Sequence, residues 1–171
     1  MSEGRSLTSD RGRWALFLGV AALVFLLDQA SKYVVLTSLS LGEAWNPIAI
    51  LKPYFSITHV TNTGAAFGLF RDHGTLFAIV AVAVVVGMVV FYRYLPSDRI
   101  WLRVSLGLQL GGALGNLLDR VHLGTVVDFI DFKFWPVFNL ADTAVVSGVA
   151  MLAFYLLFSG QEDEQKVVES D

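Results

Sequence analysis

Long apolar runs separated by short polar stretches form the dominant pattern of this 171-residue chain. The hydrocarbon core of a bilayer, about 30 Å thick, is crossed by roughly 20 residues of α-helix. Four segments have this length and character: residues 14–36, 75–95, 100–118 and 139–158. Because a helix in lipid must be apolar on its outer surface, the pattern predicts an all-α membrane protein with four transmembrane helices.

The first of these segments has an alternative interpretation as a cleaved signal peptide, because three arginines precede its apolar part. The polar residues 28–32, however, stand where a cleavage site of small residues would be expected. Periodic apolar residues then resume at Tyr33. A transmembrane helix is therefore favoured for residues 14–36.

Basic residues indicate how the predicted helices are oriented. Three arginines lie before the first segment, and three more lie in or beside the connection between the second and third. Because lysine and arginine accumulate on the cytoplasmic side of short loops, both regions are expected in the cytoplasm. The predicted organisation is a cytoplasmic tail of residues 1–13, a four-helix membrane domain of residues 14–158 and an acidic cytoplasmic tail of residues 159–171. The acidic tail is expected to be disordered from Gln161 onward.

The two longer connections, residues 37–74 and 119–138, then lie outside the cell membrane. Residues 54–61 alternate in polarity and are rich in β-branched and aromatic side chains, which predicts a strand of a small extracytoplasmic β-sheet. Residues 62–64 are typical of a turn. The second connection holds five aromatic residues and is interpreted as an interfacial segment, either a membrane-interface belt or a lid over a lipid-bearing substrate.

Composition narrows the candidate functions. The chain is 55% hydrophobic and only 16% charged, whereas soluble domains carry about 25% charged residues. It contains no cysteine, which excludes disulfides, thiol nucleophiles and thiolate metal sites. A basic stripe with interleaved aromatic residues is missing, so no nucleic acid is expected as a partner.

Charged groups in a membrane are costly, so aspartates in or near the predicted helices are the first candidates for chemistry. Asp128 follows the outer end of the third helix, and Asp142 lies in the first outer turn of the fourth. Antiparallel threading brings both to one depth at the extracytoplasmic face. Two close carboxyl groups share a proton, so the pair can accept one proton from water and donate another to a carbonyl oxygen, as in aspartic proteases.

Spacing alone leaves a structural interpretation open. Asn139 is well placed to cap the fourth helix, and Asp142 in its first turn would favour the helix dipole, so capping and catalysis are equally consistent with the pattern. Asp128 and Asp131, taken alone, are typical of interfacial loop residues. Asparagine and arginine side chains near the pair, such as Asn116 at the end of the third helix, are suited to orienting a substrate carbonyl.

Other chemistries fit the sequence less well. Ser31 and Lys32 are adjacent, so on a helix they point about 100° apart and cannot form a serine–lysine pair. The three histidines lack ligand spacing, so no metal is expected. The glycines of residues 107–115 are interpreted as close-packing positions between membrane helices.

Two non-peptidase functions compete with these interpretations. A transporter could use Asp28, Asp128 and Asp142 as a proton relay, and a structural membrane subunit could use carboxylates only to cap and pair. A relay needs polar groups through the whole bilayer depth, but residues 75–95 are almost wholly apolar.

Five short motifs occur in order between residues 28 and 142. They are D-Q-x-x-K at 28–32, N-x-G-A-A-F at 62–67, G-G-x-x-G-N-x-x-D-R at 111–120, V-D-F at 127–129 and F-N-x-A-D at 138–142. Each alone is moderately specific. Together, on four predicted helices, they make the chain resemble the lipoprotein signal peptidases, also called type II signal peptidases.

The resemblance implies an intramembrane aspartic endopeptidase of four helices with a small extracytoplasmic sheet and a mobile interfacial segment. It would remove the signal peptide from a diacylglyceryl-modified prolipoprotein by cutting before the lipidated cysteine, without a metal or other cofactor. The enzyme would be a monomer among the membrane lipids of the bacterial inner membrane. Globomycin-type cyclic peptides would be its inhibitors.

The motifs also imply roles for individual residues. Asp128 and Asp142 would be the catalytic pair. Polar side chains of four motifs would bind substrate: Asn62, Asn116, Arg120 and Asn139. Structural support would come from Asp28, Lys32, Gly64 and Asp119. An alternative for Asp119 is that it only pairs with Arg120.

Overall fold

The computed structural model describes residues 7–63, 74–94 and 99–168. In chain order the elements are α1 (Leu7–Ser38), β1 (Ala44–Trp45), a short 3-10 helix η1 (Ala49–Leu51), β2 (Ser56–Asn62), α2 (Gly74–Tyr92), α3 (Ile100–Leu123), β3 (Val126–Asp131) and α4 (Leu140–Val168). Gly64, expected in a turn and as structural support, lies outside the described residues, as do residues 65–67 of its motif. Asn62, expected in the same turn, is instead the last residue of β2.

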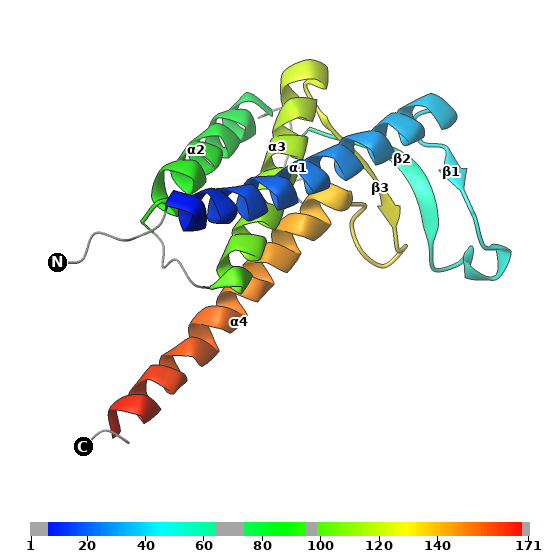
Figure 1. The fold of residues 1–171 in the computed structure, drawn as a ribbon. Helices are drawn as coiled ribbons and strands as arrows, with labels where there is room; N and C mark the ends of the chain where they lie inside the picture. Colours follow the sequence, from blue (N-terminus) through cyan, green and yellow to red (C-terminus); the bar gives the residue numbers. More distant parts are fainter. Residues whose placement is uncertain (1–6, 64–73, 95–98, 169–171) are drawn as a thin grey trace.

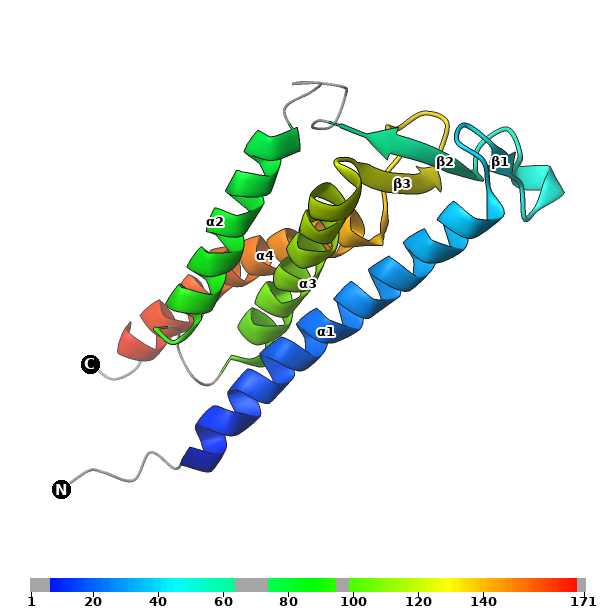
Figure 2. The same ribbon diagram turned by 90° about the horizontal axis from the view of Figure 1, so that it is seen from above.

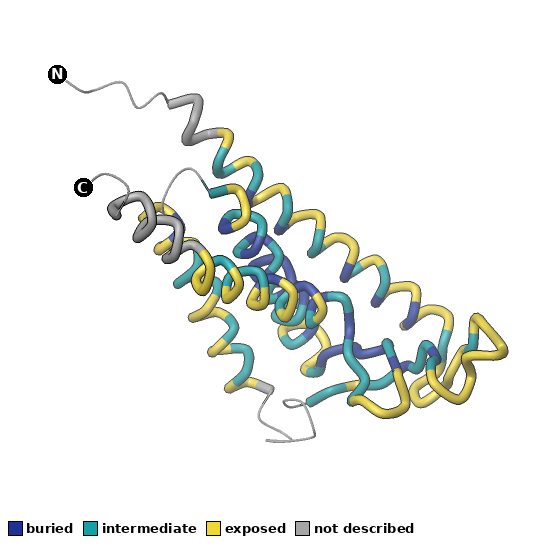
Figure 3. Tube along the Cα trace, turned by 90° about the horizontal axis from the view of Figure 1, so that it is seen from below, coloured by how far each residue is buried: buried dark blue, intermediate teal, exposed yellow. Residues whose placement is uncertain are grey.

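Helix α3 is the centre of the bundle. It packs against α1, α2 and α4, and the sheet lies at one end of these helices (Figures 1 and 2). Helix α1 begins and α4 ends at the opposite end (Figure 2). Burial follows α3 and β3, whereas long stretches of the other helices are exposed on their outward faces (Figure 3). The sheet end is therefore where loops and strands close over the interior of the bundle.

Three helices in the described part of the chain are long and apolar enough to cross a membrane: α1 over Gly12–Ser38, α2 over Thr75–Tyr92 and α4 over Leu140–Phe158. Helix α3, with 24 residues, is not among these three, and it buries polar side chains such as Ser105 and Gln109. A helix that packs against three others faces protein rather than lipid over much of its surface. Composition therefore supports three of the four predicted spans.

Two helices extend beyond their predicted ends. Helix α3 continues to Leu123, so the D-R pair of the third motif is helical rather than in a loop. It ends at Gly124, whose positive φ of 75° lets its N–H reach the Arg120 carbonyl oxygen at 3.1 Å. Helix α4 continues to Val168, so the prediction of a disordered tail from Gln161 is wrong as far as that residue.

Glycines allow α3 to approach its neighbours closely. A Cβ added at Gly112 would collide with the Ala141 carbonyl oxygen of α4, and one added at Gly115 would collide with the Asp28 carboxylate of α1. The packing interpretation of the glycine-rich third helix is thus confirmed at these positions. The two contacts bring α1, α3 and α4 together near the sheet end of the bundle.

The three strands form an antiparallel sheet in the order β1-β2-β3. Strand β2 confirms the strand predicted for residues 54–61, and its pairing with β3 places Val60 opposite Asp128. Strand β3 is missing from the sequence prediction because its residues are buried on both faces, which leaves no alternation of apolar and polar positions. Val127 of β3 packs on Val35, so the sheet is fixed to the C-terminal end of α1.

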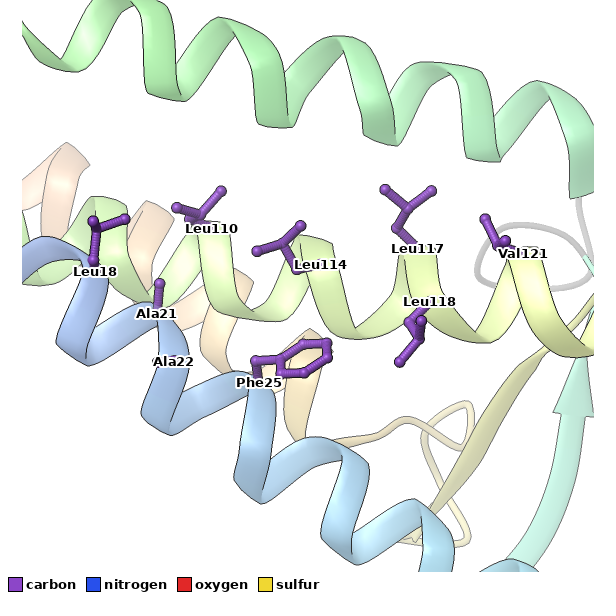
Figure 4. A pocket seen from close by; sticks show the side chains of 9 residues that line it. All are labelled: Leu18, Ala21, Ala22, Phe25, Leu110, Leu114, Leu117, Leu118 and Val121. Atoms are coloured by element: carbon purple, nitrogen blue, oxygen red, sulfur yellow. The ribbon is translucent and has the colours of Figure 1, made fainter.

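An apolar cavity of about 610 Å³ lies between α1 and α3 on the side that faces α2 (Figure 4). Its nine lining residues are Leu18, Ala21, Ala22, Phe25, Leu110, Leu114, Leu117, Leu118 and Val121. The α3 members follow a helical stripe that excludes Asn116, because successive helical residues point about 100° apart. This cavity offers no group for acid–base chemistry, so the candidate site must lie on another face of α3.

Candidate active site

Helix α4 begins with a reciprocal pair of hydrogen bonds between Asn139 and Asp142. Asn139 Oδ1 accepts the Asp142 N–H at 2.9 Å, and Asp142 Oδ2 accepts the Asn139 N–H at 3.3 Å. This arrangement is a capping box, in which the N-cap side chain and an acid in the first turn satisfy each other's backbone donors. The capping interpretation of both residues therefore describes real contacts.

The second oxygen of Asp142 makes a different contact. Its Oδ1 accepts a hydrogen bond from Asn116 Nδ2 on α3 at 2.8 Å. The carboxylate thus caps its own helix with one oxygen and meets a polar side chain of another helix with the other. Because the two oxygens are used separately, helix capping does not exclude a chemical role for Asp142.

Asp128 on β3 is held from two sides. Its side chain is 2% exposed. Its Oδ1 accepts a hydrogen bond from Asn139 Nδ2 at 2.7 Å, and its Oδ2 accepts one from Asn62 Nδ2, at the end of β2, at 3.0 Å. Two other segments, the end of β2 and the start of α4, therefore fix the position of this carboxyl group.

The Asn139 side chain connects the two acids. Its Nδ2 donates to Asp128, while its Oδ1 holds the backbone N–H of Asp142. The same Nδ2 lies 3.0 Å from Asn116 Oδ1, so both asparagines belong to one hydrogen-bonded group. The structure thus brings the two aspartates together at the first turn of α4, joined through a single amide side chain.

Burial raises the pKa of Asp128 to about 7, and the neighbouring charge of Asp142 adds to this rise. Hydrogen bonds from Asn62 and Asn139 and the positive charge of Lys32 oppose the rise without cancelling it. A carboxyl group that titrates near neutrality can either hold or release a proton at physiological pH. Asp128 therefore has the proton affinity that acid–base catalysis needs.

A buried ionic cluster of Asp28, Lys32 and Asp119 lies behind the pair. Lys32 Nζ is 2.8 Å from Asp28 Oδ2 and 2.8 Å from Asp119 Oδ2, and none of the three side chains is more than 4% exposed. The third contact of Lys32 Nζ is with Asn116 Oδ1 at 2.9 Å. Asp119 thus pairs with a lysine on α1, whereas Arg120 was the only partner that the sequence suggested for it.

Arg120 lies on the side of α3 that approaches α2. Its Nη1 donates to the Asn116 carbonyl oxygen at 3.2 Å, and its guanidinium carbon lies 5.6 Å from the centre of the Phe77 ring. The half-buried guanidinium also interacts electrostatically with Asp142 and Asp128. A cation in this position is suited to holding a carbonyl oxygen next to the two carboxyl groups.

Asp131, a candidate by sequence, lies apart from this group. It follows Asp128 by three residues on β3, so its side chain points to the opposite face of the strand. There it accepts hydrogen bonds from Lys133 Nζ at 2.6 Å and from Thr58 Oγ1 at 2.8 Å. Burial alone would raise the pKa of Asp131, but these hydrogen bonds outweigh burial and hold the pKa below its ordinary value.

Gln29 is a member of the site that sequence reasoning missed. Its Nε2 lies 3.1 Å from Asp28 Oδ2, 3.1 Å from Asp119 Oδ1 and 3.2 Å from the Gly115 carbonyl oxygen. A neutral amide in an apolar helix carries no charge that would mark it as a candidate. Its place in the D-Q-x-x-K motif is the one signal that could have identified it.

In the part of the chain that the structure describes, no three or more histidine, cysteine or acidic residues are grouped to hold a metal ion. The groups that the site does offer are two carboxyl groups, three asparagine amides and a guanidinium. Together they can move a proton and hold a polarised carbonyl oxygen.

Comparison with known proteins decides the family. A family model described as signal peptidase II matches residues 20–158. The chain belongs to the signal peptidase II family. Membership identifies it as a peptidase, and hence as a hydrolase.

Two relatives illustrate how much of the chain the family covers. The lipoprotein signal peptidase of Moorella thermoacetica is 48% identical over 146 residues, which cover 85% of this chain and 95% of that protein. The lipoprotein signal peptidase of Pseudomonas aeruginosa is 41% identical over 157 residues, covering 86% of this chain and 91% of that protein. The family model itself, over residues 20–158, includes every residue of the site from Asp28 to Asp142.

Two solved structures of the same kind share the fold. One, described as a bacterial membrane enzyme, superposes with a TM-score of 0.77 at 32% identity and covers 82% of this chain and 87% of its own. A second with the same description gives a TM-score of 0.74 at 33% identity, covering 83% and 92%. Together with the apolar spans, these likenesses identify a membrane protein.

Proposed function

We propose that the chain is an intramembrane aspartic endopeptidase that removes signal peptides from diacylglyceryl-modified prolipoproteins by cutting before the lipidated cysteine. The observation that carries the proposal is the pair of Asp128 and Asp142, connected through the Asn139 side chain. Membership of the signal peptidase II family, whose curated relatives are named lipoprotein signal peptidases, supports the substrate class.

The pair acts on a water molecule held between its two carboxyl groups. The ionised member accepts a proton from this water, whose oxygen attacks the scissile carbonyl carbon, while the protonated member donates its proton to the carbonyl oxygen. The pair then returns a proton to the amide nitrogen and takes one from a hydroxyl of the tetrahedral intermediate as the C–N bond breaks. It ends, as it began, with one shared proton.

The polar side chains around the pair bind the substrate backbone. Arg120 holds a substrate carbonyl oxygen, because its guanidinium is near both acids. The guanidinium has five N–H donors, and its hydrogen bond to the Asn116 carbonyl oxygen uses only one of them. The asparagines at positions 62, 116 and 139 orient the carboxyl groups and the peptide together, since each donates to one of the two acids or joins them.

We place the site at the extracytoplasmic face of the bacterial inner membrane, with α3 as a fourth span. The 24 residues of α3 correspond to about 36 Å of helix, which is sufficient for a hydrocarbon core of about 30 Å. Four spans return both chain ends to the cytoplasm, where the arginine-rich regions are favoured. The sheet and the two aspartates then lie at the outer surface.

A site at the outer membrane interface lies at the depth of the substrate's scissile bond. A diacylated prolipoprotein is confined to the bilayer and carries its scissile bond beside the lipid anchor, so the bond lies at the outer interface. An enzyme in the same membrane meets this substrate by lateral diffusion, as a monomer. Globomycin-type cyclic peptides are expected to compete for the site.

The test is cleavage by the purified protein in proteoliposomes. A diacylglyceryl-modified prolipoprotein is added, and release of the signal peptide is followed by mass spectrometry. Asp128→Asn and Asp142→Asn are each expected to lower the rate by at least about 1,000-fold, because an amide cannot exchange a proton with water. Asp131→Asn, the same change on the other face of β3, is expected to stay within about threefold of the wild-type rate.

Two results would contradict the proposal. One is cleavage at the wild-type rate by either of the first two variants. The other is inhibition of the wild type by EDTA, which would point to a metal-dependent reaction. The same assay on an unlipidated prolipoprotein, which is expected to remain uncleaved, tests the requirement for the diacylglyceryl group.

A further inference from the structure

Two buried acids hold the backbone immediately before each member of the pair. Asp28 Oδ1 accepts the N–H of Ala141, which precedes the α4 aspartate, at 2.9 Å. Asp119 Oδ2 accepts the N–H of Val127, which precedes the β3 aspartate, at 3.2 Å. The relative position of the two catalytic segments therefore depends on the positions of two carboxylates that belong to α1 and α3.

Lys32 connects these two carboxylates. Its Nζ contacts one oxygen of each at 2.8 Å and Asn116 Oδ1 at 2.9 Å. An ammonium group has three donors and no acceptor, so these contacts use its whole hydrogen-bonding capacity. The side chain is 2% exposed, which leaves little room for water to replace any of the three partners.

The contact with Asn116 also fixes which way that amide faces. Because Lys32 can only donate, Asn116 must present its oxygen to it, and its Nδ2 then donates to Asp142 Oδ1 at 2.8 Å. Asn139 Nδ2 approaches the same oxygen at 3.0 Å. Without the ammonium group, the Asn116 oxygen would lose the charged donor that fixes the orientation of the amide. A rotated amide would place its oxygen against the Asp142 carboxylate.

We propose that Lys32 is the positioning residue of the catalytic pair, setting the spacing and the hydrogen bonding of both aspartates through its three acceptors. The effect of Lys32 on catalysis depends on the proposed function being correct. Lys32 does not touch the reacting atoms. It acts from behind the site, through Asp28 on the α4 side, Asp119 on the β3 side and Asn116 between them.

The test uses three variants. Lys32→Met keeps the length of the side chain and removes the ammonium group, but it leaves two buried carboxylates without a cation. The double variant Lys32→Met, Asp119→Asn keeps the net charge of the cluster, and the asparagine oxygen can still accept the Val127 N–H. Lys133→Met is the matched control, because it also removes a lysine paired with an aspartate, in this case Asp131 on the far face of β3.

The double variant, shown to be folded by its unfolding transition, is expected to have a kcat at least about 100-fold below wild type with KM within about threefold. The physical reason is that the carboxyl pair, rather than the surface that binds the lipid and peptide, is displaced. Lys133→Met is expected to keep both constants within about threefold of wild type. A general loss of stability would instead appear as a lowered unfolding transition of the double variant, because Lys32 is 2% exposed whereas Lys133 is 38% exposed.

A second readout needs no substrate. The carboxyl groups are titrated by infrared spectroscopy in wild type and variants, with Asp128→Asn used to assign the Asp128 band. The charges that act on Asp128 include that of Lys32, which lowers the pKa of Asp128. Removing it is expected to raise the midpoint of the Asp128 titration by about one pH unit.

A folded double variant that keeps the wild-type kcat would overturn the positioning role, and so would an unshifted Asp128 midpoint. The proposed function fails separately, if wild-type protein releases no signal peptide from the lipidated substrate. In that case the infrared midpoint still decides whether Lys32 acts on the Asp128 carboxyl group.

Discussion

At the scale of single residues, the site relies on side chains that make two kinds of contact at once. Asn139 caps α4 with its oxygen and donates to Asp128 with its nitrogen. Asp142 completes the cap with one oxygen and accepts from Asn116 with the other. From the sequence, capping and catalysis are alternatives, because spacing shows which residues share a helix face but not how each atom is used.

The ionic cluster shows what a sequence cannot specify at this scale. The motifs that contain Lys32 and Asp119 are recognisable by themselves, but the nearest basic neighbour of Asp119 in the chain is Arg120. The contact with Lys32 exists because α1 packs on the glycine face of α3, a helix that lies far from α1 in the sequence. Ion pairs of this kind follow from how the helices pack. A sequence motif is compatible with that packing but does not determine it.

Asp128 gives the folded protein a dependence of stability on pH. Burial, with the charge of Asp142, raises the pKa of Asp128 to about 7, above its value in the unfolded chain. The folded state therefore binds more protons between the two values, so the free energy of unfolding is expected to fall as pH rises from about 4 to about 7. Asp128→Asn is expected to flatten this slope in thermal unfolding measured in detergent. An equally steep slope in the variant would show that other groups cause it.

The same proton is expected to limit activity. If the pair must carry one proton to act, kcat/KM falls as pH rises above about 7, where Asp128 ionises. The measurement is the initial rate of signal-peptide release at low substrate concentration over a range of pH. A rate that keeps rising above this pH would contradict the need for a protonated carboxyl group.

At the scale of elements, the glycine face of α3 determines how closely three helices meet. Strand β2 and the packing role of these glycines are predictable from local pattern, because alternation and small residues each mark one kind of environment. Strand β3 is not, because it is buried on both faces and so lacks alternation, and the last turn of α3 is not, because the polar residues Asp119 and Arg120 interrupt its apolar run. Polarity there reflects partners inside the protein rather than contact with water.

Substitution of a single glycine tests this packing. Gly112→Ala adds a Cβ that meets the backbone of Ala141, which cannot move aside as a flexible side chain would. The variant is expected to lower the free energy of unfolding by about 1–3 kcal/mol and to reduce activity, because Ala141 precedes Asp142. Thermal unfolding and signal-peptide release measure the two effects.

Gly87→Ala on α2 is the matched control. Nothing lies within 4 Å of a Cβ added there. Because alanine favours helix more than glycine does, this variant is expected to be unchanged or more stable by up to about 1 kcal/mol. Equal destabilisation by both substitutions would show that the close approach of α3 and α4 is unimportant.

At the scale of the whole molecule, apolar side chains are exposed along the outer helices while the buried polar groups of the site gather near the sheet. Hydropathy identifies the helices that face lipid, and for this reason it supports α1, α2 and α4 more clearly than α3. The number of spans therefore has to be determined from which side of the membrane each loop lies on, rather than from composition.

Introduced cysteines can show on which side of the membrane each loop lies, because the chain has no cysteine of its own. Tyr94, between α2 and α3, and Trp135, between β3 and α4, are 67% and 58% exposed. Tyr94→Cys is expected to react with a membrane-impermeant maleimide only after permeabilisation, and Trp135→Cys in intact cells. Labelling of both from the same side would show that α3 does not span. Leu41→Cys, after α1, is the control and should match Trp135→Cys.

Asp28 and Lys32 also matter while the chain is being made. They lie four residues apart on one helix, with Lys32 Nζ 2.8 Å from Asp28 Oδ2. When α1 enters the membrane, the ribosome has not yet produced α3 and α4, so their later partners do not exist. The spacing lets each charge neutralise the other meanwhile, which reduces the cost of inserting them. Newly synthesised α1 thus already carries a partner for each charge, to which the later helices add further ones.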